Sequence, residues 1–279
     1  MAIGMVPTRA RGQKRGNVEI VRVAGLPFRA TTVPEAAAWL ISEAQQKRGT
    51  SVRLANAYCV ALASRSDEYR AVLSGQGVNY PDGTPIALAM KLALRRKKSN
   101  VRASRVRGPS FFNEVLERLG DTSLKSFFLG NSEATEAQFL QVLEERFPRT
   151  LVAGSFAPPF EPLSPNYIEG CVEAVRHSGA DIVWIGLGTP KQDFVAQAIA
   201  ERLHLPCIGV GAAFDFLSGN VKEAPPHIQR IGLEWMYRLV REPRRLWRRY
   251  TVGNVQFLAA VAADHFRNRS ADTPPGRAK

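Results

Sequence analysis

The sequence predicts an α/β fold: a Rossmann-like, mostly parallel sheet flanked by helices, with a C-terminal helical appendage. Short apolar runs alternate with helical patterns from residue 18 to about residue 221, as expected of parallel strands joined by crossover helices. Two of these runs end in loops that contain glycine and proline. After about residue 222 the alternation stops and consecutive helical patterns follow. These observations indicate one α/β unit followed by a helical extension.

Each expected strand is a short apolar run, and each expected helix has apolar residues three or four positions apart. Strands are expected at residues 18–23, 52–54, 78–80, 126–129, 151–153, 182–185 and 207–210. Helices are expected at residues 33–46, 57–64, 84–96, 111–119, 133–147, 166–178 and 194–203. Thr32 is a suitable N-cap for the first of these helices. We find no internal repeat.

The appendage is expected to be amphipathic. Residues 231–266 read as consecutive helices with a break at Pro243. At about 100° per residue, arginines fall on one face and large apolar residues on the other. The arginine face comprises Arg238, Arg241, Arg245 and Arg248, joined by Arg244 and Arg249. The apolar face comprises Trp235, Leu239, Leu246, Trp247 and Tyr250. Such a helix lies at a membrane interface, or docks on the domain and offers arginines to an anion.

The ends of the chain differ from the rest. Residues 1–17 form a basic tail, and residues 268–279 form a polar tail containing Pro274 and Pro275. Both are expected to be disordered. We therefore expect a Rossmann-like catalytic domain at residues 18–221 and the appendage at residues 222–267.

Positive charge is concentrated in two segments. The chain of 279 residues has a formal net charge of +13. Residues 91–107 hold eight Lys or Arg and no acid, and residues 222–249 hold eight Lys or Arg and three acids. These segments account for the whole net charge, so the remainder is balanced. Concentrated charge indicates an anionic partner: a nucleic acid, an anionic membrane surface or a diphosphate.

Cysteine usage and hydropathy favour a cytoplasmic protein. Cys59, Cys171 and Cys207 are odd in number, widely spaced and set among apolar residues, so buried free thiols are expected. The basic N-terminus lacks the apolar stretch of a signal peptide. No window reaches the roughly 18 apolar residues of a membrane span. Any membrane contact is therefore expected to be peripheral.

The segment that follows the run at 182–185 predicts an anion site. It reads Gly186-Leu187-Gly188-Thr189-Pro190-Lys191-Gln192-Asp193. We expect a strand, a tight loop and a helix start, with Thr189 as the cap and Pro190 in the first helical position. Exposed N–H groups at a helix start, together with Lys191, suit an anion such as a diphosphate.

A second loop of the same design carries a carboxylate where the first carries a lysine. It reads Pro81-Asp82-Gly83-Thr84-Pro85 and follows the run at 78–80. Ligands of parallel α/β sheets bind at the carboxyl ends of the strands, so the two loops suggest a phosphate-bearing substrate that faces a general base, Asp82. The alternative is a turn aspartate, since Pro-Asp-Gly is common turn chemistry.

These features together resemble the WecG/TagA/CpsF family of glycosyltransferases (glycosyltransferase family 26), over about residues 18–265. Besides the two loops, the resemblance is carried by Arg105-Val106-Arg107-Gly108, Phe128-Leu129-Gly130, and Gly209-Val210-Gly211 through Phe214-Asp215 to Gly219. The most specific part is Gly232-Leu233-Glu234-Trp235-Met236-Tyr237-Arg238-Leu239, continued by Glu242-Pro243-Arg244-Arg245. The order and spacing of these motifs match the family throughout.

The resemblance implies an inverting, metal-independent hexosyl transfer from a UDP-sugar. The implied acceptor is a polyprenyl-diphosphate-linked saccharide at the inner face of an anionic cell membrane, and the product feeds a surface polysaccharide or exopolysaccharide. No cofactor or metal is implied, and the sequence has no Asp-x-Asp motif. The appendage is expected to close over the site and to contact the membrane.

The resemblance also assigns roles to residues. Asp82 is the expected base, and Asn56, Arg105 and Gln192 are expected beside the reacting groups. Substrate binding is expected of Gly186, Gly188, Thr189, Lys191, Asp215, Arg238, Arg245 and Arg248, the last three over the donor diphosphate. The alternatives are a helix cap for Asn56 and Asp215, a solvated position for Lys191, and simple membrane adhesion for the arginines.

Two positions depart from the family pattern. The family usually has Thr-x-Asn where this chain has Leu54-Ala55-Asn56, and it tends to have Arg-Ala-Pro where this chain has Glu223-Ala224-Pro225. This chain therefore lacks a hydroxyl group at position 54 and a cation at position 223.

Two other classes of protein compete with the glycosyltransferase. The charge alone would suit a nucleic-acid-binding protein, but no helix-turn-helix, zinc or ribonucleoprotein signature is present. A Rossmann-fold oxidoreductase would be expected to have a first-strand Gly-x-Gly-x-x-Gly with a downstream acid, which is absent.

Overall fold

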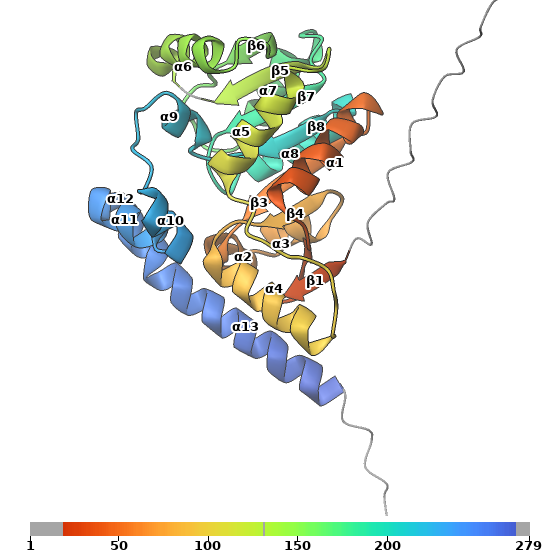
Figure 1. Ribbon diagram of the computed structural model, residues 1–279, viewed down its shortest axis with the longest axis vertical. Coiled ribbons are helices and arrows are strands. Elements are labelled where there is room, and N and C mark those ends of the chain that lie inside the picture. Colours follow the sequence, from red (N-terminus) through yellow and green to blue (C-terminus); the bar gives the residue numbers. More distant parts are fainter. Residues whose placement is uncertain (1–18, 131, 272–279) are drawn as a thin grey trace, which may run out of the picture.

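The computed structural model describes residues 19–130 and 132–271 (Figure 1), so the expected N-terminal tail and most of the C-terminal one lie outside the described residues. Six parallel strands form the main sheet, in the order β4-β3-β8-β7-β5-β6. They are β3 (Thr50–Ala55), β4 (Val78–Pro81), β5 (Lys125–Gly130), β6 (Leu151–Phe156), β7 (Ile182–Gly186) and β8 (Pro206–Gly209). The predicted α/β, Rossmann-like class is confirmed.

Helices cover both faces of this sheet because its central strands are apolar on both sides. Phe128 and Trp184 point into one buried cluster, whereas their neighbours Phe127 and Val183 point into another. The first cluster is covered by α1 (Val33–Gln45), α5 (Gly108–Leu119), α6 (Glu133–Arg146) and α9 (Ala213–Leu217). The second is covered by α7 (Pro165–Arg176) and α8 (Lys191–Leu203).

A third cluster lies beyond the β3–β4 side of the sheet. It is built by α2 (Ala57–Ala63), α3 (Asp67–Ser74), α4 (Thr84–Arg96) and the antiparallel pair β1 (Ile20–Val23) and β2 (Leu26–Arg29). The expected single strand at 18–23 is thus half of a hairpin. Its turn residues Ala24 and Gly25 both have positive φ, as a two-residue turn of the primed type requires.

The appendage consists of α10 (Pro226–Ile231), α11 (Glu234–Arg241), α12 (Pro243–Tyr250) and α13 (Val252–Ala271). The expected break at Pro243 is confirmed, since α12 begins there. Helix α13 continues to Ala271 and so includes the first four residues, 268–271, of the expected tail. Within the described ranges, no helix is both long enough and apolar enough to cross a membrane.

Helix α13 returns to the core and packs along α2 (Figure 1). Phe257 of α13 is only 6% exposed and belongs to the third cluster. The appendage is therefore attached at both of its ends: by the connector at 220–225 and by the docking of α13. Helices α11 and α12 therefore lie between two segments that are attached to the core.

Candidate active site

A cavity of about 600 Å³ lies at the carboxyl edge of the sheet. The loops after β3, β4, β7 and β8 form its floor, which is where ligands of parallel α/β sheets bind. Helices α11 and α12 form its other wall. The structure brings all but one of the expected site residues to this cavity, namely Asn56, Asp82, Arg105, Gly186, Gly188, Thr189, Gln192, Asp215, Arg238, Arg245 and Arg248.

Asp82 stands at the end of β4, just before α4. Its backbone N–H donates to the Ala55 carbonyl oxygen at 3.0 Å, which fixes the loop against β3. The pKa of Asp82 is raised to about 6, chiefly by burial and also by the nearby Glu234 carboxylate, while Arg105, Arg107 and Arg249 oppose the rise. A carboxylate with this pKa is ionised at neutral pH and is a stronger base than an ordinary aspartate.

Asn56 is the N-cap of α2. Its Oδ1 accepts hydrogen bonds from the backbone N–H groups of Tyr58 at 3.0 Å and Cys59 at 3.3 Å. The cap that the sequence left as an alternative is therefore present, and Asn56 also lines the cavity. Only its amide nitrogen remains to contact a ligand.

Gln192 joins the two loops that follow β7 and β8. Its side chain is 3% exposed. Its Oε1 accepts hydrogen bonds from the backbone N–H groups of Gly188 and Gly211, each at 3.1 Å. The Gly188 N–H is therefore paired within the protein, although Gly188 itself lines the cavity. Gln192 thus holds these two loops together at the floor of the cavity.

The loop before α8 differs in detail from the expected one. The Thr189–Pro190 peptide bond is cis, and α8 begins at Lys191, so neither Thr189 as N-cap nor Pro190 as first helical residue is correct. The Thr189 hydroxyl lines the cavity and lies 3.9 Å from the Cys59 sulfur. Gly186 is required by packing, since a Cβ there would lie 2.6 Å from the Phe214 ring.

Lys191 is the one expected site residue that does not line the cavity. Its Nζ donates to the carbonyl oxygen of Glu161 and lies 4.4 Å from the centre of the Tyr167 ring. The lysine is therefore held on the loop after β6 by a hydrogen bond and a cation–π contact.

The appendage contributes most of the cations of the cavity, and Arg105 of the core contributes another. Arg238 of α11 lies over the Phe216 ring, 5.5 Å from its centre, and Arg245 of α12 pairs with Glu242 at 2.8 Å. Asp215 faces these two arginines; burial raises its pKa, and Arg245 and Arg238 oppose that rise. The cavity thus has a cationic wall opposite the base.

The expected arginine face and apolar face of the appendage do not separate the cavity side from the solvent side. Trp235 lines the cavity together with Arg238 of the same helix α11, and Leu246 lines it together with Arg245 and Arg248 of α12. Trp247, by contrast, is 47% exposed and does not line the cavity. The cavity therefore contacts the border between the two expected faces.

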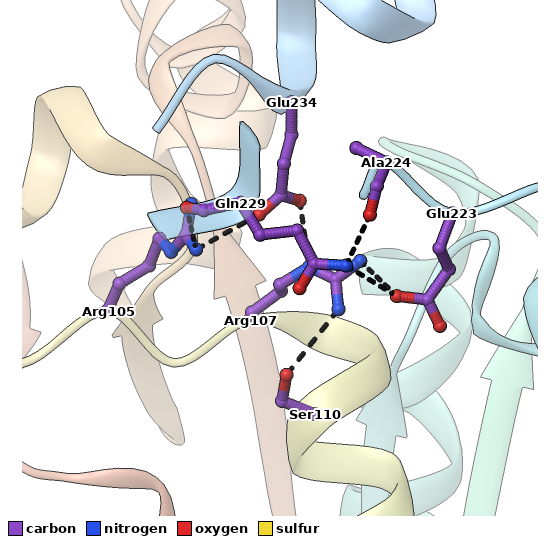
Figure 2. Close-up of polar contacts among 7 residues, drawn as sticks. All are labelled: Arg105, Arg107, Ser110, Glu223, Ala224, Gln229 and Glu234. Carbon is purple, nitrogen blue, oxygen red and sulfur yellow. Dashed lines mark hydrogen bonds and ion pairs between the residues drawn. The ribbon is translucent and has the colours of Figure 1, made fainter. Parts of the chain in front are cut away.

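Arg105 and Arg107 connect the core to the appendage (Figure 2). Glu234 forms an ion pair with each of them: its Oε1 lies 3.0 Å from Nη2 of Arg105, and its Oε2 accepts a hydrogen bond from Nε of Arg107 at 2.7 Å. Arg105 also donates to the Gln229 carbonyl oxygen at 3.0 Å. Arg105 therefore borders the cavity while its guanidinium is held by the appendage.

Glu223, one of the two departures from the family pattern, completes this cluster. Its Oε2 lies 2.5 Å from Nη2 of Arg107 and 3.3 Å from the Gln229 amide nitrogen. Leu54, the other departure, lines the cavity and is 6% exposed within the core cluster. An arginine at position 223 would be repelled by the like charge of Arg107, whereas the glutamate forms an ion pair with it.

Several cavity residues were not among the expected site residues, and those with polar or aromatic side chains include Tyr58, Glu234, Trp235 and Arg249. Arg249 lies over the Tyr58 ring, 4.8 Å from its centre. The helical pattern placed Arg249 with the arginine face, but its orientation across the break at Pro243 could not be predicted. The contact with Tyr58 of α2 directs the Arg249 side chain toward the cavity.

Beneath the cavity, a buried polar network ties α8 to the third cluster. The Tyr69 hydroxyl donates to Oδ2 of Asp193 at 2.6 Å. Burial raises the pKa of Asp193 to about 6, against the effects of the Tyr69 hydrogen bond and of Arg53. Arg53 is 1% exposed and donates to Asn79 and to the Val72 carbonyl oxygen, each at 2.7 Å. This network fixes the start of α8.

All three cysteines are free and buried, as expected. Across residues 19–130 and 132–271, no three His, Cys, Asp or Glu side chains gather as a potential metal site. The model of the WecG/TagA/CpsF family of glycosyl transferases matches residues 21–271, and the chain belongs to that family. It is therefore a glycosyltransferase of cell-surface polysaccharide biosynthesis. This membership decides among the three classes that the sequence left in competition.

Proposed function

We propose that this protein is a UDP-sugar-dependent hexosyltransferase. It moves a sugar, with inversion and without a metal ion, to a polyprenyl-diphosphate-linked saccharide of a surface polysaccharide or exopolysaccharide. The observation that carries the proposal is a single cavity with Asp82 on the core side and Arg238, Arg245 and Arg248 on the appendage side. Its volume of about 600 Å³ lies within the usual range for ligand sites.

The reaction is a single displacement. The acceptor hydroxyl attacks the anomeric carbon of the donor, the new C–O bond forms, and the bond to the diphosphate breaks on the opposite face. Asp82 takes the hydroxyl proton, and its pKa of about 6 suits a base that works near neutral pH. The electron pair of the broken bond leaves with UDP.

The departing diphosphate gains negative charge as the bond breaks. Cations placed in advance where that charge develops lower the barrier, which is the role a metal ion has in other transferases. The three arginines are assigned this role because they line the cavity and because the appendage that carries them is attached to the core at both ends. The other polar groups that line the cavity, including Asp215 and the Asn56 amide, are assigned to orienting the donor.

The acceptor is anchored in a bilayer, so the protein is proposed to work on the inner face of the cell membrane. Exposed apolar residues gather on the appendage: Val240 is 76% exposed, Val255 68% and Leu258 65%. Apolar and arginine side chains on the same helices favour the interfacial region of an anionic bilayer.

The direct test is UDP release by the purified protein, with chelator present. It is mixed with a panel of UDP-sugars and a short-chain polyprenyl-diphosphate saccharide. Release that depends on the acceptor, with one donor, is the expected result. Release without acceptor would contradict transfer, and a strict requirement for Mg²⁺ or Mn²⁺ would contradict departure assisted by arginine.

A further inference from the structure

The outward face of α4 carries two leucines that contact solvent. Leu88 is 55% exposed and Leu92 is 48% exposed. They are four residues apart, so they lie on one side of the helix. The opposite side holds Ile86, Met90 and Leu94, which are buried in the third core cluster. A single exposed leucine is ordinary, but two in line, directly opposite the buried side, form a stripe.

Cations flank this stripe. At about 100° per residue, Lys91 and Arg95 lie on one side of it and Arg96 on the other. Lys97 and Lys98 follow at the end of the helix. All five are exposed, and none takes part in an ion pair of the described residues. An apolar stripe between rows of cations is the pattern of a helix that lies in the interface of an anionic bilayer.

Helix α13 presents a second apolar surface at the same end of the molecule (Figure 1). Its exposed residues between positions 252 and 263 are all uncharged, namely Val252, Val255, Leu258, Ala259, Ala262 and Ala263. Helices α4 and α13 pack on one core cluster, through Met90 and Leu94 on the one and Phe257 on the other. The two outward surfaces therefore belong to one rigid part of the protein.

The same helix α4 begins at the reacting groups. Asp82 and Gly83 line the cavity and lead directly into Thr84, the first residue of α4. With 13 residues, the helix is about 20 Å long. One rigid element thus connects the proposed base to the basic, apolar surface.

We propose that α4 is a membrane-contacting helix of the catalytic core. Leu88 and Leu92 enter the interfacial region of an anionic bilayer, and the cations of residues 91–98 bind lipid phosphates. This inference rests on the proposed function and adds to it a contact outside the appendage. Because α4 starts two residues after Asp82, contact along it holds the cavity close to the lipid surface, where the diphosphate of the acceptor lies.

Cosedimentation of the full chain with vesicles tests the proposal. The vesicles contain phosphatidylglycerol and phosphatidylcholine in one arm and phosphatidylcholine alone in the other. Leu88→Ser combined with Leu92→Ser should weaken binding to the anionic vesicles by about tenfold or more. The matched control is Leu151→Ser combined with Val152→Ser on β6, at the opposite edge of the sheet; these residues are 42% and 46% exposed. The control should bind like wild type.

A second measurement reports contact directly and does not depend on a loss of binding. Cys59, Cys171 and Cys207 are at most 2% exposed, so a polarity-sensitive maleimide dye labels an introduced surface cysteine selectively. The emission of the dye on Leu92→Cys should shift to shorter wavelength when anionic vesicles are added. The dye on Val152→Cys should show no shift.

The outcomes separate this inference from the function on which it rests. If wild type binds anionic vesicles but the α4 double variant binds equally well and the Leu92→Cys dye does not respond, the inference is overturned and the membrane location stands. If wild type binds neither kind of vesicle but binds a DNA duplex, the contact through α4 and the membrane location are both overturned. Reduced binding of the α4 variant, together with a dye shift at position 92, supports the contact through α4 and the membrane location. UDP release with a water-soluble acceptor should be equal in wild type and the α4 variant, because neither leucine lines the cavity.

Discussion

Arg107 of the core and Glu223 of the appendage connector form an ion pair, with 2.5 Å between Nη2 and Oε2. The Arg107 side chain is 10% exposed and that of Glu223 is 34% exposed. Glu234 of α11 completes the contact on the other side of the guanidinium, at 2.7 Å. A family position that tends to hold arginine thus holds an acid here, and this acid helps to fix the appendage over the cavity.

We expect a double-mutant cycle on this pair to show coupling. Arg107→Ala and Glu223→Gln, alone and together, should give a coupling energy of about 1–3 kcal/mol in unfolding, because the pair is largely shielded from water. Urea unfolding measures it. The control cycle uses Arg149 and Asp121, whose side chains are 69% and 70% exposed; that pair should couple by less than about 1 kcal/mol. Equal coupling in both cycles would mean that the Arg107–Glu223 pair does not fix the appendage.

Gln192 is expected to support the site from beneath. Gln192→Ala removes the acceptor of two backbone N–H groups, those of Gly188 and Gly211. The free energy of unfolding should fall by about 1–3 kcal/mol and turnover by at least about tenfold, since buried donors without partners are costly. Gln197→Ala on the same helix removes only an exposed bond to Glu201 and should change stability by less than about 0.5 kcal/mol. An unchanged melting temperature with weaker donor binding would instead assign Gln192 to the substrate.

The appendage arginines should affect turnover unequally. Arg245→Gln and Arg248→Gln remove cations that line the cavity, and each should lower kcat by about 10- to 100-fold by weakening stabilisation of the departing diphosphate. Arg244 is adjacent and exposed but does not line the cavity, so Arg244→Gln serves as the control. Steady-state kinetics with saturating donor distinguish the variants. A similar kcat for all three would refute the role of the arginines in catalysis.

Much of this architecture could be predicted from the sequence because it depends on local patterns. Helix α4 matches the expected range at both ends, and Asp82, at the end of β4, lies in the cavity as the rule for parallel sheets requires. The hairpin turn at Ala24–Gly25 was missed because its signal is a positive φ at a residue that is not glycine or asparagine.

The positions of individual side chains could not be predicted in this way. Lys191 is turned toward Tyr167 by a contact between elements far apart in sequence, and Arg249 reaches the cavity through its contact with Tyr58. The orientation of such long side chains depends on their tertiary neighbours, which the helical periodicity of the sequence does not reveal.

The pKa of Asp82 predicts two pH effects of opposite kind. Turnover should fall as pH drops through about 6, because the base becomes protonated. The effect on stability has the opposite sign. A folded-state pKa above the ordinary value of 3.8 means that the folded protein prefers the protonated form, so the free energy of unfolding should fall as pH rises from 3.8 to about 6 and should change no further above that.

Asp82→Asn should therefore stabilise the protein at pH 7.5 by roughly 1–2 kcal/mol, a range that allows for the partial exposure of the side chain. The gain should vanish below about pH 4, where aspartate is protonated in both the folded and the unfolded chain. Thermal unfolding at the two pH values measures this. An equal gain at both would show that the carboxylate is not the cause.

The decisive measurement for Asp82 as the general base is turnover of Asp82→Asn at saturating UDP-sugar and acceptor. We expect acceptor-dependent UDP release to fall by at least about 100-fold, while UDP-sugar binding, measured by calorimetry, stays within a few-fold of wild type. This combination means that the carboxylate acts on the acceptor proton and is not needed to hold the donor. Turnover close to wild type, with binding intact, would contradict the assignment of Asp82 as the base.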